Sequence, residues 1–152
     1  MNAALVAILM GSRSDKSVMD KAGEILSELG IPSETLVMSA HRQPELVSEY
    51  AAAAAGEGIK VIICGAGMAA HLAGAVAAKT ILPVIGVPVK SGALEGIDAL
   101  LSTAQMPGGV PVATVAIDGA KNAAYLAAEI IALNDADVRE RLLKMRQEQA
   151  GG

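Results

Sequence analysis

The sequence predicts an α/β fold, a three-layer α/β/α sandwich built around a five-stranded parallel sheet. Apolar runs of strand length alternate with segments of helical periodicity along all 152 residues. The runs are solidly apolar and do not alternate with polar residues, which is typical of parallel strands buried on both faces. The length predicts a single domain, residues 1–152, and we find no internal repeat or linker in it.

The elements can be placed in order along the chain. A first strand at 5–10 precedes a helix that runs from Asp15 to Leu29 and is ended by Gly30 and Pro32. The other strands are expected at 34–39, 60–64, 82–89 and 110–117. The other helices are expected at 44–56, with Pro44 in the first turn, up to about Thr80, at 94–101, at 122–133 and at about 135–149.

The composition disfavours several classes of protein. Apolar residues make up 53% of the chain, but charged or other polar residues interrupt every apolar run before the roughly 18 residues that a membrane span needs. The net charge of −4 and the lack of a basic cluster disfavour nucleic-acid binding. A single cysteine, Cys64, is consistent with a cytoplasmic location and is expected to be inert in its strand. Two tyrosines, with no Phe or Trp, leave little for a flavin to stack on.

The loop after the first strand has the residues of an anion site. Ligands of open α/β sheets bind beyond the carboxyl ends of the strands. In "GSRSD", Gly11 permits a close turn, Ser12 and Ser14 supply hydroxyls, and the next helix offers free N–H groups. Asp15 would repel phosphate and suits sugar hydroxyls better. The alternative is that Ser14 or Asp15 only caps the helix.

The loop after the second strand, "SAHRQP", carries a proton donor and acceptor next to a fixed cation. Arg42 presents a fork of N–H donors to a phosphate or carboxylate. His41 belongs to the one residue type whose ordinary pKa, about 6.5, allows proton transfer in both directions near neutrality. The alternative is a surface histidine without a role, but its place at the carboxyl end of a strand favours function.

The loop after the third strand, "GAGMAAHLAG", matches the dinucleotide-binding pattern only loosely and lacks the later acidic residue. A small glycine-lined pocket for part of a ligand fits it better. His71 lies near a helix start, where the helix dipole disfavours a cation, so we expect it to be neutral. A capping or packing histidine is the alternative. Later in the chain, Lys90 is expected to be solvated, and the loop 105–112 either closes over the site or only connects elements.

Six motifs, in this order over almost the whole chain, resemble the N5-carboxyaminoimidazole ribonucleotide mutase family, class I of the PurE family: "MGSRSD", "SAHRQP", "GAGMAAHLAG", "VIGVPVKS", "LLSTAQMPGGVPVATVAI" and "AKNAAYLAAEI". The resemblance implies a flavodoxin-like sandwich and an enzyme of de novo purine biosynthesis that needs no metal, cofactor or ATP. It also implies a homo-octamer whose sites draw on more than one subunit. The last helix, with its stripe of Val138, Leu142 and Met145, would then serve in oligomer contacts.

The resemblance also implies a reaction and roles for residues. The substrate is a ribonucleotide monophosphate, and its carboxyl group moves from the exocyclic nitrogen to carbon 4 of the imidazole. His41 is the implied general acid and base; Ser12, Ser14 and Arg42 hold the 5′-phosphate, and Asp15 the ribose hydroxyls. Further substrate contacts are expected from Ser39, Ala40, Gly67, Met68, Ala69 and His71.

The chain departs from the family pattern in places. Met68 stands where many members have Gly, and we expect it to narrow the pocket. Ala73 replaces the Pro of "HLPG", Gln43 replaces the Thr of "AHRTP", and Asp118 falls in a stretch usually read "AIGG". Two alternatives stay open: the CO2-dependent aminoimidazole ribonucleotide carboxylase of the sister branch, and a non-catalytic nucleotide-binding module that would not need His41.

Overall fold

A five-stranded, all-parallel sheet forms the centre of the computed structural model, which describes residues 2–152. The strand order is β2-β1-β3-β4-β5, so the order reverses next to β1, the arrangement of flavodoxin-like folds. The strands are β1 Val6–Met10, β2 Ser33–Val37, β3 Val61–Gly67, β4 Val84–Val89 and β5 Ala113–Thr114. The predicted three-layer fold is confirmed.

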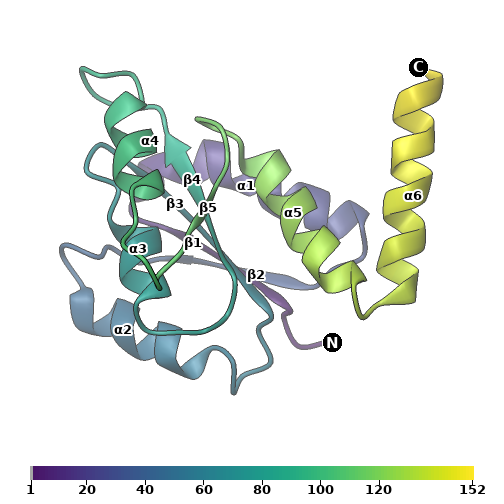
Figure 1. Ribbon diagram of the computed structural model, residues 1–152, viewed down its shortest axis with the longest axis horizontal. Coiled ribbons are helices and arrows are strands. Elements are labelled where there is room, and N and C mark those ends of the chain that lie inside the picture. The colour runs from purple at the N-terminus through teal and green to yellow at the C-terminus, as the bar shows by residue number, and fades with distance from the viewer. Residues whose placement is uncertain (1) are drawn as a thin grey trace.

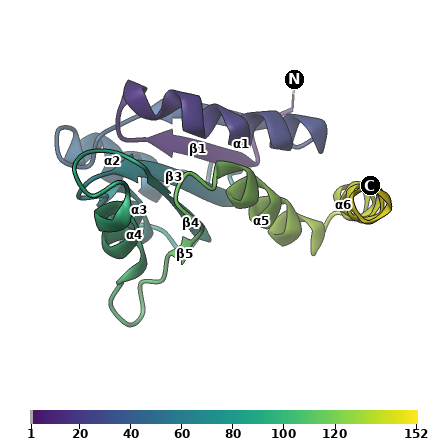
Figure 2. The ribbon, with the colours of Figure 1, turned by 90° about the horizontal axis from the view of Figure 1, so that it is seen from above.

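Helices cover both faces of the sheet (Figures 1 and 2). They are α1 Lys16–Glu28, α2 Pro44–Ala53, α3 Leu72–Ala77, α4 Ile97–Ala104, α5 Ala120–Ala132 and α6 Ala136–Gly151, with a 3-10 turn, η1, at Arg13–Asp15. Helices α1 and α5 lie on one face, and α2, α3 and α4 on the other. None of the helices in the part of the chain described is long and apolar enough to cross a bilayer.

The sheet separates two hydrophobic cores, because successive strand residues point to opposite faces. Ile8 and Ile63 join α1 and α5, whereas Leu9 and Ile62 join α2 and α3. The first core depends on a close approach between α1 and β3. A Cβ atom on Gly65 would lie within 3 Å of three atoms of Met19, so a larger residue there would displace the buried Met19 side chain. This approach brings the start of α1 close to the end of β3.

The fifth strand is much shorter than the predicted 110–117. Pro111 has no N–H and cannot donate a hydrogen bond to β4. Pro88 of β4 also has no N–H, so it cannot donate to the fifth strand. Pairing is therefore limited to Ala113 and Thr114, after which the chain turns through Asp118 in the left-handed region, at φ 59°. The backbone N–H of Asp118 donates to the Pro88 carbonyl oxygen at 2.8 Å.

The helix predicted at 94–101 begins three residues later, at Ile97. Gly92, Glu95 and Gly96 all have left-handed φ angles, of 67°, 58° and 94°, so the chain cannot enter a helix before them. Strand β3 continues to Gly67, beyond its predicted end at residue 64. The remaining boundaries differ by at most three residues, as helix ends commonly do.

Helix α6 projects from the body beside α5 (Figures 1 and 2). The stripe of Val138, Leu142 and Met145 was expected to serve in oligomer contacts, but Val138 and Leu142 are buried against the chain's own core and Met145 packs partly on it. Arg141 donates from Nη1 to the Leu29 carbonyl oxygen at 3.0 Å, at the end of α1. A Cβ on Gly30 would meet this guanidinium at 2.8 Å. The first half of α6 is thus fixed to the end of α1.

Candidate functional site

The candidate site is a pocket of about 120 Å³ at the carboxyl ends of β1, β2 and β3, beside the reversal in strand order. Eight of the residues predicted for the site line it: Asp15, Ser39, Ala40, His41, Arg42, Gly67, Ala69 and His71. Three others that line it were not predicted as contacts: Gly11, Ala66 and Leu72. Three predicted residues, Ser12, Ser14 and Met68, are not part of this lining.

The first loop holds its two serines beside the pocket. Ser12 caps the 3-10 turn, because its Oγ accepts hydrogen bonds from the N–H and the hydroxyl of Ser14, at 3.3 and 3.0 Å. Ser12 therefore has the capping role, and Ser14, which was considered as a helix cap, is a donor to Ser12 within the turn. Asp15 stands at the N-cap position of α1 but makes no capping bond with its side chain. Its carboxylate is free to accept hydrogen bonds from a ligand.

Asp15 is a buried carboxyl group, with 6% of its surface exposed. Burial is the largest influence on its pKa and raises it, since the charged form loses water. A hydrogen bond from the Ser12 backbone lowers the pKa, and the negative charge of Asp118 raises it again, for a net increase. A desolvated carboxylate of this kind is typical of a ligand-binding position.

The second loop positions Arg42 between two strands. Its backbone N–H and Nε both approach Ser39 Oγ, at 3.2 and 3.4 Å, and Nη2 lies 3.5 Å from the Gly11 carbonyl oxygen. Gln43 closes the same turn, because its N–H donates to the Ser39 carbonyl oxygen at 2.8 Å. The guanidinium therefore spans the ends of β1 and β2, next to the start of α1.

His41 and His71 form a pair at the centre of the site. His41 Nε2 lies 2.6 Å from His71 Nδ1, and the two rings meet edge to face with centroids 4.8 Å apart. One of the two nitrogens must carry the proton and the other must accept it. His71 stands at the N-cap position of α3, as one alternative from the sequence proposed, but its side chain makes no capping hydrogen bond and contacts His41 instead.

The third loop shows where the expectation for Met68 was wrong. Met68 has a left-handed backbone, with φ 54°, which turns its side chain away from the pocket and toward Gly92. More than half of the residue, 55%, is exposed. Gly67 itself lines the pocket, and a Cβ there would meet Ser91 at 2.9 Å. Met68 therefore does not narrow the pocket.

The residues missed by sequence reasoning carry no polar side chain. Gly11 was predicted only to permit a close turn, and Ala66 and Leu72 entered only as letters of the "GAGMAAHLAG" motif. Position was the usable signal, because each lies within two residues of one that was predicted. Leu72 is buried and lines the pocket next to His71 in the chain.

Two side chains near this edge have other roles. Lys90 forms an exposed ion pair with Glu95 at 2.8 Å, and this pair raises the pKa of Lys90. The backbone N–H of Lys90 donates to Asp118 Oδ1. Cys64 is fully buried, and burial raises the pKa of its thiol, so it is unreactive as expected. No group of three or more His, Cys, Asp or Glu side chains suited to a metal gathers within residues 2–152.

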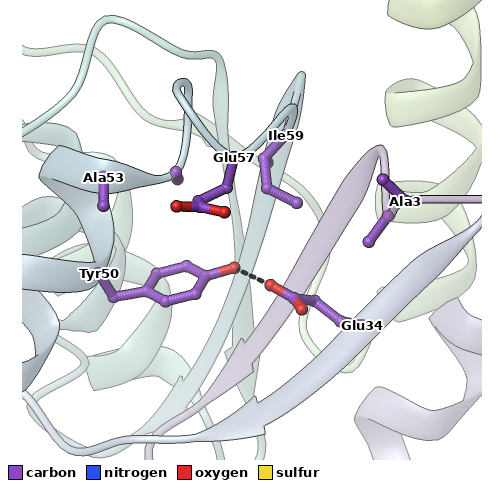
Figure 3. A pocket seen from close by; sticks show the side chains of 8 residues that line it. Ala3, Glu34, Tyr50, Ala53, Glu57 and Ile59 are labelled. Atoms are coloured by element: carbon purple, nitrogen blue, oxygen red, sulfur yellow. Dashed lines mark hydrogen bonds between the residues drawn. The ribbon is translucent and has the colours of Figure 1, made fainter.

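A second pocket lies at the opposite, amino end of the strands (Figure 3). Ala3, Ile59 and Glu57 line it, together with Tyr50, whose hydroxyl donates to Glu34 Oε1 at 2.5 Å. Burial and the Glu34 carboxylate raise the pKa of Tyr50. The site at the carboxyl ends holds both histidines and Arg42, and this pocket holds neither kind of group.

Comparison with known proteins agrees with this geometry. The model of the AIR carboxylase family matches residues 5–151. The chain belongs to this family. A family relative from Pyrococcus horikoshii, named N5-carboxyaminoimidazole ribonucleotide mutase, is 58% identical over 91% of this chain and 78% of its own. Relatives of the same name from Bacillus subtilis and Escherichia coli are 57% and 51% identical, over 94% and 97% of this chain and 90% and 89% of theirs.

Solved structures of the family share the fold. The crystal structure of Treponema denticola PurE superposes with a TM-score of 0.89, at 32% identity, over 97% of this chain and 92% of its own. The resemblance found in the six sequence motifs is confirmed, and the function predicted from them agrees with the name of the relatives.

Proposed function

We propose that the protein is an N5-carboxyaminoimidazole ribonucleotide mutase of purine biosynthesis. One observation carries the proposal: His41, in the loop after β2, stands next to Arg42 and within 2.6 Å of His71, in a pocket that the buried Asp15 also lines. The pocket thus offers a proton carrier, a fixed cation and a desolvated carboxylate. Relatives at 51–58% identity that carry this name support it.

His41 supplies both proton transfers that the reaction needs. It donates a proton to the exocyclic nitrogen as the carbamate C–N bond breaks, which releases carbon dioxide and a neutral aminoimidazole. Carbon 4 then attacks the carbon dioxide, a C–C bond forms, and His41 removes the proton from that carbon. Substrate and product are isomers, so no co-reactant is consumed. A single imidazole side chain can act first as the acid and then as the base.

His71 holds the ring of His41 in place between these two steps. The hydrogen bond between His41 Nε2 and His71 Nδ1 fixes the orientation of both rings in the free protein. Because His71 follows the strand that lies beside the pocket, its ring also borders the space for the base of the nucleotide. In a small pocket the released carbon dioxide stays next to carbon 4. This proximity replaces a supply of carbon dioxide from bulk solution.

Binding of the nucleotide is divided between two loops. Arg42, with Ser12 and Ser14 beside it, holds the 5′-phosphate at the start of α1, where the helix dipole favours an anion. Asp15 accepts hydrogen bonds from the ribose hydroxyls. This division gives the phosphate the cation and the hydroxyls, gives the ribose the carboxylate, and leaves His41 facing the base.

The function is tested by identifying the product from the carbamate substrate, with and without added bicarbonate. We expect conversion at neutral pH without bicarbonate and little label in the product from labelled bicarbonate. If conversion instead requires the uncarboxylated ribonucleotide and bicarbonate, with label appearing stoichiometrically in the product, the protein is a carboxylase. A non-catalytic nucleotide-binding module would bind the nucleotide but convert neither the carbamate nor the uncarboxylated ribonucleotide.

The assembly and location belong to the same proposal. The enzyme works in the cytoplasm as a homo-octamer. Large apolar side chains that a single chain leaves exposed support an assembly, since they need a partner to be removed from water: Ile97, Leu101, Leu133 and Leu143 are each more than half exposed. Leu143 lies on α6, so this helix takes part in the contacts between subunits.

A further inference from the structure

The loop that carries His71 is held in an uncommon conformation. Met68 is in the left-handed region, and the N–H of His71 donates to the Ala69 carbonyl oxygen at 3.0 Å, a tight turn centred on Ala70. Such conformations persist only where surrounding groups fix them. What fixes this turn therefore also determines where the His71 ring meets His41.

Ser102, on α4, makes the contact at the centre of the turn. The N–H of Ala70 donates to Ser102 Oγ at 2.9 Å, and Ala70 is buried, with 2% of its surface exposed. The hydroxyl of Ser102 donates in turn to the Asp98 carbonyl oxygen, four residues earlier in α4, at 2.8 Å. Its oxygen is thereby oriented toward the loop, and the Met68 carbonyl oxygen lies 3.4 Å away.

We propose that Ser102 is a positioning residue for the reaction: it fixes the 68–71 turn from α4 and so holds His71 against His41. It touches neither the pocket nor the ring of His71, and it acts through the peptide of Ala70. A buried N–H that loses its acceptor must either stay unpaired or move to reach water. In the second case the turn relaxes and the His41–His71 contact opens.

The test compares Ser102→Ala with Ser102→Thr, which keeps the hydroxyl, and with Ser27→Ala, a matched control at an exposed helical serine on α1. Three quantities are measured: kcat and KM for the proposed mutase reaction, amide hydrogen exchange in segment 66–72, and Tm. For Ser102→Ala we expect kcat to fall about 10-fold and exchange at Ala70 to rise by a similar factor. Tm should change by only a few degrees. Ser102→Thr should restore most of the turnover and most of the protection of Ala70 from exchange.

The outcomes separate this inference from the function on which it rests. Unchanged kcat in Ser102→Ala, or faster exchange spread evenly over the chain, would overturn the positioning role, since a merely structural serine gives the second pattern. Restored exchange protection without restored turnover in Ser102→Thr would also overturn it. If the wild-type protein does not convert the substrate at all, the proposed function fails, and the exchange measurement still decides whether Ser102 fixes the turn.

Discussion

His41 and His71 lie 30 residues apart in the sequence, yet their ring nitrogens are 2.6 Å apart at the carboxyl edge of the sheet. The two rings can share a single N–H proton, so each fixes the position of the other before a substrate arrives. A general acid and base that is already oriented loses little freedom in the reaction. The roles assigned to the side chains around this pair lead to separate expectations.

Replacing His41 by Asn should separate catalysis from binding. His41→Asn keeps a polar side chain of similar size but cannot exchange protons near neutrality. We expect nucleotide affinity to stay close to that of the wild type and turnover to fall at least about 100-fold, the usual scale for a proton-transfer group. Calorimetric binding and single-turnover kinetics check this. Weak binding with normal turnover of the bound substrate would contradict the role.

Replacing Arg42 by Ala should affect binding more than turnover. A contact to the phosphate is the same in the ground state and the transition state, so its loss raises KM with little change in kcat. Arg13→Ala is the matched control, because Arg13 is an exposed neighbour on η1 outside the pocket lining. Steady-state kinetics on both variants decide the matter. Loss of kcat at saturating substrate, with KM unchanged, would refute the phosphate role of Arg42.

Asp15 should lower the stability of the protein at neutral pH. Its folded pKa is raised above the ordinary value of 3.8, mainly by burial. At a pH above the folded pKa, the charged carboxylate therefore lowers the stability of the folded protein. This cost shrinks as the pH falls through the folded pKa, and the cost is absent below pH 3.8. Asp15→Asn should thus raise Tm at pH 7, lose that gain on acidification, and bind nucleotide more weakly. Glu24→Gln, on the exposed side of α1, should show no such pH dependence.

Met68 should be replaceable by Gly with a gain in stability. A non-glycine residue at φ 54° carries backbone strain, and the exposed Met68 side chain gives little packing in return. We expect Met68→Gly to be about 0.5–1 kcal/mol more stable. Ala69→Gly, one residue along and without a positive φ, should lose about 0.4–1 kcal/mol instead. Urea denaturation of both variants measures the difference, and equal destabilisation would show that Met68 is not strained.

The exposed face of α6 should control assembly without affecting the fold of the subunit. Deleting the whole helix would also uncover the core beneath Val138 and Leu142, so a point change is the cleaner test. Leu143→Glu places a charge where the side chain is 58% exposed. We expect light scattering to give a smaller particle, whereas Gln147→Glu, equally charged and also exposed, should leave the assembly intact. Full-size assembly of Leu143→Glu would remove α6 from the interface.

The sequence predicted strands and loops well and backbone conformation poorly. Solid apolar runs determine where a buried parallel strand can lie, and the site residues followed from the ends of those strands. The start of α4 was missed because Glu95 takes a left-handed φ that its residue type disfavours. The direction of Met68 was missed for the same reason.

Contacts between distant segments were also beyond the reach of pattern reasoning. Nothing in the spacing of His41 and His71 indicates that their rings touch, since the contact depends on how two loops turn after neighbouring strands. Ser102 reads as an ordinary polar residue inside a helix, and only the fold brings the N–H of Ala70 to it. Family resemblance supplied the role of His41 but gave no sign of either contact.

The two tyrosines, with no tryptophan in the chain, make each side of the sheet separately visible to optical spectroscopy. Tyr50 packs against the core under α2 and α3, and Tyr125 against the core under α1 and α5. Tyr50→Phe leaves Tyr125 as the only tyrosine, on the side of α1 and α5. Tyr125→Phe leaves Tyr50, on the side of α2 and α3. We expect emission from Tyr50 to be quenched by its hydrogen bond to the Glu34 carboxylate and to brighten when that bond opens. Recording the two variants during denaturation would show directly whether both layers melt together or one after the other.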